Sequence, residues 1–349
     1  MSSAPSRVVP PAPAPARIVV PAGGIGAARF LRGLRAAAPD ADITVIGNTG
    51  DDITLFGLRV CPDLDTVMYT LGGGIDEDQG WGRADETFAV KEELGRYGVG
   101  PDWFGLGDRD LATHVVRTQM LGAGYGLGAV TAALCRRWGL AEQRITLLPM
   151  SDDRVETHVV IDDDENPGRR RAVHFQEYWV RLRAHPVAHE VIAVGAEDAK
   201  PGPGVLEAIA AADLVVLPPS NPVVSIGTIL AVPGVAAALA DAEAPVVGVS
   251  PIIGGAPVRG MADRVLAAIG VPTTAEAVAL HYGAHLLDGW LVDARDEAAV
   301  GGVEAAGIRC RAVPLMMSGL DATTKMARAA LDVAASAASA APAAPAAPR

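Results

Sequence analysis

Basic side chains are scarce in this sequence. The chain has 349 residues, and its 29 Lys and Arg residues face 41 Asp and Glu residues, which gives a formal net charge of −12. A nucleic-acid partner is therefore not expected, because such a protein needs a basic patch that displaces counterions. A ligand that carries phosphate has to be held by local features instead, such as backbone N–H groups and a metal ion.

Cysteines and long apolar runs are also scarce. Cys61, Cys135 and Cys310 are far apart and form no CxxC pair, which predicts reduced, mostly buried thiols. No HxH or HExxH motif is present, so zinc is not expected. No apolar run approaches the roughly 20 residues of a membrane span, and the Pro/Ala-rich stretch 1–15 lacks the apolar region of a secretory signal. We expect a cytoplasmic protein without a membrane segment.

Two tails of low complexity frame the chain. Residues 1–16 and 336–349 are dominated by proline, alanine and serine, a composition that favours disordered chain and cannot build a core. Between them, residues 17–335 are long enough for a single α/β domain with an inserted subdomain. We place a helical insertion at about residues 66–140.

Short apolar runs alternate with helical stretches between the tails. Such runs predict parallel strands that are buried on both faces of a sheet. The predicted strands are Arg17–Val20, Ile43–Gly47, Ile145–Leu148, Val191–Val194, Asp213–Leu217 and Pro245–Val249. The predicted helices are Ala27–Ala38, Asp85–Tyr97, Leu111–Leu121 and Gly128–Trp138. The pattern predicts a doubly wound, mostly parallel, Rossmann-like α/β fold with an inserted helical and hairpin subdomain.

The hairpin of that subdomain is expected around a polar turn. Residues 162–168 are rich in aspartate and end in Pro-Gly, which is typical of a turn. Val155–Ile161 and Arg169–Arg183 on either side predict two antiparallel strands that lean on the main sheet.

A glycine turn follows the first predicted strand and opens directly into a helix. Gly23, Gly24 and Gly26 allow a phosphate to approach free backbone N–H groups at the helix start, where the helix dipole favours an anion. A tight turn without a ligand is the alternative. The dinucleotide pattern is incomplete, because Arg29 stands in place of a third glycine and Asn48 in place of a ribose-binding acid. This weakens the case for an NAD-dependent oxidoreductase.

Four carboxylates cluster after the second predicted strand. They are Asp51, Asp52, Asp63 and Asp65. Open α/β sheets bind ligands at the carboxyl edge of their strands, and several acids beside a phosphate repel it unless a cation lies between them. Magnesium, which takes hard oxygen ligands, is the simplest cation to expect here. Capping of a helix that begins near Thr66 is the alternative for one of the four acids.

Three later segments supply further candidates. Consecutive glycines precede Trp81, which fits either a stacking platform over a flat ligand or a core position. Ser220 and Asn221 stand between a strand and a helix, where they fit helix capping or contact with a purine edge. Ser250 ends the next strand; Arg259 and Asp263 beyond it fit phosphate and guanine or ribose contacts, or a surface ion pair. Composition leaves these alternatives open.

Several of these loops together resemble the CofD family. The resemblance lies in residues 23–26, 48–52, 61–74 and 219–222, and it extends from about Arg17 to about Val333. The longer runs 100–114, 174–177 and 220–227 are similar to the actinobacterial branch of that family, FbiA.

The resemblance implies a transferase of deazaflavin coenzyme F420 biosynthesis. Such an enzyme takes a GDP-activated three-carbon acid, transfers its phospho-acid part to the terminal hydroxyl of the deazaflavin Fo, and releases GMP. The acid is expected to be enolpyruvate in the actinobacterial branch and 2-phospholactate in archaeal relatives, and the sequence leaves both donors open. A homodimer is also implied.

The resemblance assigns expected roles to the candidates. Mg²⁺ held by Asp51, Asp52, Asp63 and Asp65 would bridge the diphosphate, and Asp52 by preference, or Asp51, would orient or deprotonate the Fo hydroxyl. Phosphate would be held by Gly23, Gly24 and Gly26. Guanosine would be seated by Ser220, Asn221, Ser250, Arg259 and Asp263. The deazaflavin side would include Tyr69, Trp81 and Lys91.

A second function class shares this resemblance. Gluconeogenesis-factor proteins are similar to the family, bind nucleotide sugars and act as regulators rather than enzymes. The segment from Asp63 to Tyr69, with the glycines after it, is expected in the transferases as the wall on the Fo side. Its presence favours the enzyme.

Overall fold

The computed structural model describes residues 14–338. Most of both predicted tails, 1–13 and 339–349, lies outside these residues, and residues 336–338 belong to the last helix, α12 (Leu320–Ala338). Within the described part of the chain, no helix is long and apolar enough to cross a membrane.

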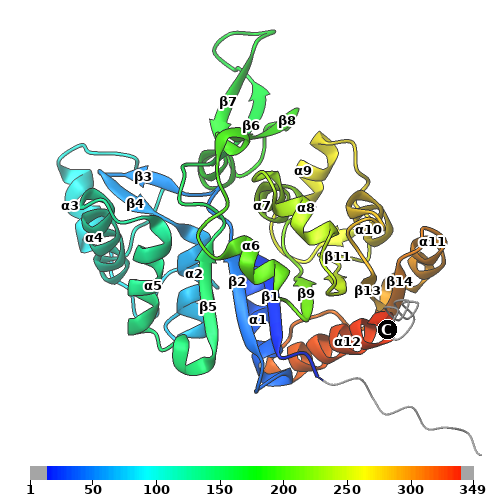
Figure 1. The fold of residues 1–349 in the computed structure, drawn as a ribbon. Helices are drawn as coiled ribbons and strands as arrows, with labels where there is room; N and C mark the ends of the chain where they lie inside the picture. The colour runs from blue at the N-terminus through cyan, green and yellow to red at the C-terminus, as the bar shows by residue number, and fades with distance from the viewer. Residues whose placement is uncertain (1–13, 339–349) are drawn as a thin grey trace, which may run out of the picture.

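A seven-stranded sheet with the order β14-β13-β10-β9-β1-β2-β5 forms the centre of the molecule, and every pair of neighbours in it is parallel (Figure 1). Its strands are β1 (Arg17–Ala22), β2 (Asp42–Gly47), β5 (Ile145–Pro149), β9 (Leu214–Leu217), β10 (Val246–Val249), β13 (Gly289–Asp293) and β14 (Arg309–Val313). The Rossmann-like α/β prediction is confirmed.

Both faces of the sheet are covered by helices, which explains the continuous apolar runs. In β1, Ile18 and Val20 belong to one core cluster, while Val19 between them belongs to the other. The first cluster includes α1 (Gly24–Ala37), α2 (Pro62–Leu71), α5 (Leu127–Arg137) and α12. The second includes α6 (Val205–Ala210), α7 (Thr228–Ala231), α8 (Val235–Ala240), α9 (Ala262–Ala268), α10 (Ala275–Tyr282) and α11 (Val300–Ala305). Each strand therefore contributes side chains to two cores.

The connection from β2 to β5 carries the helical block on the left of Figure 1. It contains a short ribbon of β3 (Ile53–Leu55) and β4 (Leu58–Val60), then α2, α3 (Ala89–Arg96), α4 (Asp108–Gly122) and α5. Helix α3 begins four residues after its predicted start at Asp85, since Asp85 has a φ of 53°, which is outside the helical region.

A separate antiparallel sheet, of order β7-β6-β8, projects beyond the main sheet (Figure 1). It consists of β6 (Glu156–Asp162), β7 (Arg170–His174) and β8 (Glu190–Val194). Two strand predictions are right only in part here. The run Val191–Val194 pairs with β6 and not with the main sheet, and Arg169–Arg183 is a strand only as far as His174, because Glu177–Arg181 forms a helical turn.

The order of the main sheet locates a topological switch point. From β1 the chain passes to β2 on one side, whereas β9, on the other side of β1, is formed much later in the sequence. The loops that leave β1 and β9 thus diverge to opposite sides and open a crevice at the carboxyl ends of these strands, which is where open α/β sheets bind ligands.

Candidate functional site

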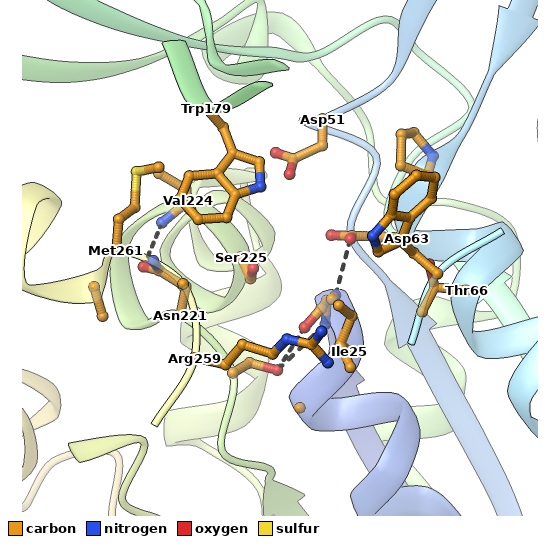
Figure 2. A pocket seen from close by; sticks show the side chains of 18 of the residues that line it. Ile25, Asp51, Asp63, Thr66, Trp179, Asn221, Val224, Ser225, Arg259 and Met261 are labelled. Carbon is orange, nitrogen blue, oxygen red and sulfur yellow. Dashed lines mark hydrogen bonds between the residues drawn. The ribbon is translucent and has the colours of Figure 1, made fainter. Parts of the chain in front are cut away.

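A cavity of about 1000 Å³ occupies this crevice (Figure 2). Its walls include loops that follow four neighbouring strands. The lining residues among the sequence candidates are Gly23, Gly24, Gly26, Asp51, Asp63, Asp65, Tyr69, Trp81, Ser220, Asn221, Ser250 and Arg259. Most of the predicted site residues are therefore brought together, although they come from positions up to 236 apart in the sequence, from Gly23 to Arg259.

Gly23 and Gly26 in the glycine turn lie so close to their neighbours that neither has room for a side chain. A Cβ atom at Gly23 would lie 2.7 Å from Asp63 Oδ2, and one at Gly26 would collide with the carbonyl oxygen of Pro219. Gly24, with a φ of +73°, donates its N–H to Asp63 Oδ1 at 2.8 Å. Ser220 ties the two loops of the switch point together, since its hydroxyl donates to the Gly23 carbonyl at 2.9 Å.

Asp51 and Asp63 are the two predicted acids that face the cavity without a cationic partner (Figure 2). Asp63 Oδ2 accepts from Asn48 Nδ2 at 2.9 Å, while Asp51 Oδ1 is buried without a hydrogen-bond partner. Burial, and then the charges of Asp63 and Asp52, raise the pKa of Asp51 well above its ordinary value. Burial also raises the pKa of Asp63 to about 6.

Asp52 points elsewhere and does not line the cavity. Its Oδ2 lies 3.0 Å from Arg59 Nη2 and 2.9 Å from Cys61 Sγ, and its side chain is buried. Burial raises the pKa of Asp52 to about 6, although Arg59 opposes this shift. Its backbone carbonyl accepts from His174 Nε2 at 3.1 Å, and this bond connects the acid loop to β7.

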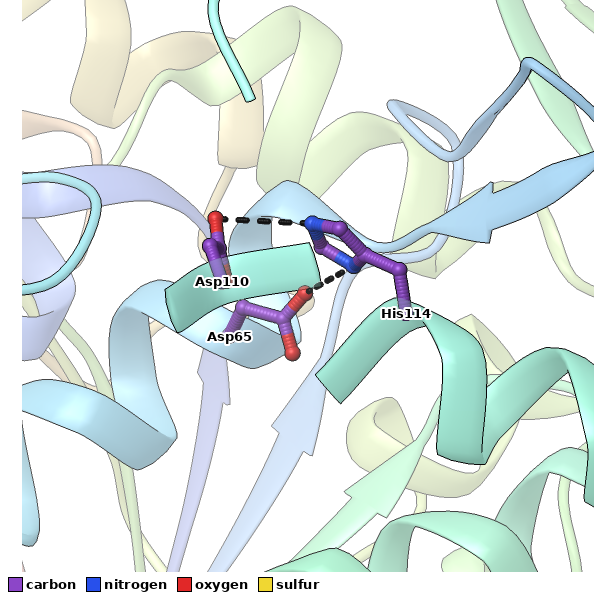
Figure 3. A group of neighbouring side chains, drawn as sticks. All are labelled: Asp65, Asp110 and His114. Atoms are coloured by element: carbon purple, nitrogen blue, oxygen red, sulfur yellow. Dashed lines mark ion pairs between the residues drawn. The ribbon is translucent and has the colours of Figure 1, made fainter. Parts of the chain in front are cut away.

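Asp65, on α2, has a third environment. It contacts a network of side chains from helix α4, of which His114 and Arg117 are buried, as Asp65 is (Figure 3). It forms an ion pair with Arg117, and its Oδ2 lies 3.8 Å from His114 Nδ1, while His114 Nε2 lies 3.4 Å from Asp110 Oδ2. Figure 3 shows the His114 ring between the two carboxylates. Arg117 Nη1 lies 3.1 Å from His114 Nδ1, so the guanidinium borders the same ring.

The geometry of the acids distinguishes two places where a cation could bind. Ligand atoms of Asp65, Asp110 and His114 lie within 4.8 Å of one another, but Arg117 already supplies positive charge to that group. Asp51 and Asp63 have no basic side chain beside them. Asp51 Oδ1 accepts no hydrogen bond, so a cation could bind there without displacing a donor. Their carboxylates fit Mg²⁺, which takes one or two protein oxygens and leaves its other positions to water and phosphate.

The remaining sequence candidates are placed unevenly. Asn221 Oδ1 accepts from the N–H groups of Val223 and Val224, so this side chain caps the helical turn Pro222–Gly227 while it borders the cavity. Lys91 and Asp263 do not line the cavity, and Asp263 forms an exposed ion pair with Arg264.

The aromatic candidates also differ in their exposure. Trp81 is 46% exposed and lines the cavity. Tyr69 is buried, and its hydroxyl donates to Asp110 at 2.5 Å and contacts Thr113 at 2.8 Å. Trp81 therefore offers an open ring face to a ligand, while the hydroxyl of Tyr69 is already bonded within the protein.

One wall of the cavity was missed from the sequence. Phe175, Gln176 and Trp179 follow β7 and line the cavity, and Figure 2 shows Trp179 across the cavity from Asp63. The 40% exposure of Trp179 makes it a second aromatic platform. The residues of the α4 network were missed too, although Asp110, His114 and Arg117 recur at the spacing of one helix face.

Comparisons with known proteins agree with this layout. Residues 18–307 match the model of a family described as 2-phospho-L-lactate transferase CofD. A phosphoenolpyruvate transferase of Streptomyces griseus is 73% identical over 318 residues, which are 91% of this chain and 98% of that protein. A protein of the same name from Thermobifida fusca is 64% identical over 326 residues, again 91% of this chain and 98% of the relative.

A solved structure shares the fold. It is a protein of the UPF0052 family from Bacillus halodurans, 19% identical to this chain, with a TM-score of 0.59 over 90% of this chain and 98% of the other. At this level of identity the likeness concerns the fold alone.

Proposed function

This chain belongs to the CofD family of transferases, and from that premise we propose the reaction that its cavity serves. The enzyme transfers a phosphoenolpyruvyl or 2-phospho-L-lactyl group from a GDP-activated donor to the terminal hydroxyl of the deazaflavin Fo. GMP is released, and the product is coenzyme F420-0 or its dehydro form. The name of the relatives, phosphoenolpyruvate transferase, favours the enolpyruvyl donor.

The single observation that carries the proposal is a helix N-terminus beside two uncompensated carboxylates. The turn at Gly23 and Gly24 begins helix α1, and Asp63 hydrogen-bonds to that turn while Asp51 faces the same cavity. A helix N-terminus attracts anions and an acid pair attracts cations. A diphosphate with its divalent metal ion fits this arrangement, because the phosphate can bind the helix N-terminus while the metal ion binds the two acids.

The transfer is an in-line displacement at phosphorus. The Fo hydroxyl oxygen attacks the phosphorus that carries the three-carbon acid, a new P–O bond forms, and the bond to the phosphate of GMP breaks. Such reactions depend on positioning and on charge neutralisation. Asp51 and Asp63 are the residues that would hold Mg²⁺, whose charge supplies that neutralisation when it is bound.

Asp51 takes over the role that the sequence suggested for Asp52. Its carboxylate faces the cavity, whereas that of Asp52 does not. In this proposal Asp51 orients the Fo hydroxyl and receives its proton. Trp81 and Trp179, which are both exposed and both line the cavity, would contact the deazaflavin ring.

The test is a transfer assay of the purified protein with Mg²⁺, Fo and each of the two donors, read by mass spectrometry. A product of Fo plus the phospho-acid, with stoichiometric GMP, supports the proposal, and the faster donor identifies the acid. Asp51→Asn should abolish the product, and Asp263→Asn, outside the cavity, is the matched control. Tight nucleotide binding without any product from either donor would instead indicate a regulatory binding protein.

The homodimer and Lys91 on the deazaflavin side stay predictions. The mass of the protein in solution, measured by light scattering, tests the first. The effect of Lys91→Gln on the KM for Fo tests the second.

A further inference from the structure

Two arginines line the cavity without an acidic partner. Arg29 lies on α1, and Arg259 lies in the loop after β12 (Ala256–Pro257). Within residues 14–338, no Asp or Glu side chain forms an ion pair with either of them. Figure 2 shows Arg259 extending toward Ile25 at the start of α1.

Both guanidinium groups reach the same point. A Cβ atom built on Gly80 would lie 2.9 Å from Arg259 Nη1 and 3.4 Å from Arg29 Nη2. Two cations so close together repel each other, and the hydrogen bonds described for them go to neutral carbonyl oxygens. Arg259 Nη2 donates to the Gln79 carbonyl at 2.8 Å, and Arg29 Nη2 donates to the Glu77 carbonyl at 3.2 Å. The pair is thus a preformed anion site at the cavity wall.

The segment that supplies these carbonyls is a self-contained loop, Ile75–Arg83. A β-bridge between Ile75 and Arg83 closes it, and the Asp76 carboxylate accepts from N–H groups inside it. Its hydrogen bonds to the body of the protein include those to Arg29 and Arg259, together with an ion pair between Arg32 and Glu77. Trp81, which lines the cavity, belongs to this loop.

The proposed donor has one anionic group more than its diphosphate. The glycine turn and the acid pair provide for the two phosphates, while the carboxylate of the three-carbon acid needs a cation of its own. Among the Lys and Arg residues that the structure describes, the cavity is lined by Arg29, Arg183 and Arg259. Arg29 and Arg259 converge at Gly80, whereas Arg183 follows the helical turn that carries Trp179. The planar fork of a guanidinium matches a carboxylate in a bidentate manner.

We propose that Arg29 and Arg259 bind the carboxylate of the donor's three-carbon acid, and that the loop Ile75–Arg83 covers this subsite. The inference rests on the proposed function and deepens it. A guanidinium has five N–H donors, so each arginine can keep its loop carbonyl while it binds the carboxylate. The subsite then distinguishes the loaded donor from GDP, the same nucleotide without the acid.

The experiment compares two nucleotides by calorimetry in the presence of Mg²⁺: GDP and lactyl-diphosphoguanosine, a donor that carries the carboxylate. Loss of a charge-assisted pair predicts that Arg29→Gln and Arg259→Gln each weaken binding of the lactyl nucleotide about ten- to a hundredfold. Affinity for GDP should change by less than about threefold, within the scatter expected of a remote contact. Arg32→Gln is the matched control, because Arg32 binds the loop through Glu77 without lining the cavity.

The outcomes separate this inference from the function on which it rests. An equal loss for both nucleotides would mean that the arginines contact the diphosphate, and an unchanged affinity for the lactyl nucleotide would place its carboxylate elsewhere. Either result overturns the inference and leaves the transferase intact. If Arg32→Gln weakens the lactyl nucleotide as much as Arg29→Gln does, attachment of the loop is the cause, and the carboxylate assignment fails. Wild-type protein that binds neither nucleotide would overturn the proposed function itself.

Discussion

The four aspartates that follow β2 and β4 have three different surroundings in this protein. Asp51 and Asp63 face the cavity, Asp52 is paired with Arg59, and Asp65 is paired with Arg117. A buried carboxylate that lacks a partner destabilises the fold. We therefore expect the charged form of Asp51, whose Oδ1 has no hydrogen-bond partner, to lower the stability of the folded protein.

Asp51→Asn is expected to stabilise the metal-free protein while it abolishes transfer. The pKa of Asp51 is raised above its unfolded value, so the folded protein holds the neutral acid at low pH, and stability is lost as pH rises from the ordinary pKa through the folded one. Asparagine avoids this loss. We expect a gain of about 0.5–2 kcal/mol at pH 8 and much less at pH 4.

Thermal unfolding at both pH values in the presence of EDTA measures this gain. A gain of the same size at pH 4 and pH 8 would show that Asp51 does not titrate as described. A loss at both would show that its carboxylate makes a stabilising contact.

Asp52→Asn should separate structure from catalysis. Because Asp52 does not line the cavity, we expect kcat for transfer to stay within about threefold of the wild type, as for mutations away from the reacting atoms. The unfolding free energy should fall by about 1–3 kcal/mol, since Arg59 loses its partner in a largely buried position. A loss of kcat comparable to that of Asp51→Asn would return the hydroxyl-facing role to Asp52.

At the scale of elements, the glycine turn shows why a strand and a helix can meet so closely. Gly26 lies against the Pro219 carbonyl, so β1, α1 and the loop after β9 converge where the phosphate is proposed to bind. Continuous apolar strands and the turn into α1 were predictable from sequence, because the spacing of apolar residues and the residues of a turn are local properties of the chain.

Gly26→Ala is expected to lower stability by about 1–3 kcal/mol, because its Cβ would push the two loops apart, and to weaken nucleotide binding. The control is Gly301→Ala in α11, where a Cβ meets open space and should add about 0.5–1 kcal/mol. Chemical denaturation and calorimetry with GDP measure both effects. Tight GDP binding by Gly26→Ala would place the phosphate elsewhere.

The network on α4 joins that helix to α2 through a buried ion pair. Arg117→Met leaves Asp65 buried and unpaired, so we expect a loss of about 3–5 kcal/mol. Asp65→Asn added to this variant removes the unpaired charge and should recover part of the loss. Denaturation of both variants checks this, and equal stability of the two would show that the charge of Asp65 is compensated by other groups.

Where the sequence failed, the deciding contacts were not local. The run Val191–Val194 is apolar enough for a central strand, but its exposure alternates, and it pairs with β6 instead. Conversely, β14 contains two arginines and was not predicted, although it is the edge strand beside β13. Strand identity follows from composition, while sheet membership follows from tertiary pairing.

At the scale of the whole molecule, the strand order determines where the site can be. The carboxyl ends of β1 and β9 are adjacent because the two strands are parallel neighbours. After β1 the chain first adds strands on one side of β1, and later adds β9 on the other side. The sequence therefore located the loops after β1, β2 and β9, because Gly23, Asp51 and Ser220 each follow a predicted strand. The sequence did not reveal whether Asp51 or Asp52 faces the cavity. That choice depends on Arg59 and Cys61, which bind the Asp52 carboxylate.

On the proposed function, Asp51 and Asp63 hold a divalent ion against the diphosphate of the nucleotide. Binding of Mn²⁺, followed by electron paramagnetic resonance with and without GDP, measures this arrangement. We expect GDP to tighten Mn²⁺ binding at least about tenfold in the wild type, as coupled ligands do. Asp51→Asn and Asp63→Asn should abolish this coupling, while Asp263→Asn should retain it. Mn²⁺ binding that is independent of GDP, or unchanged in both site variants, would show that these two carboxylates do not hold the ion.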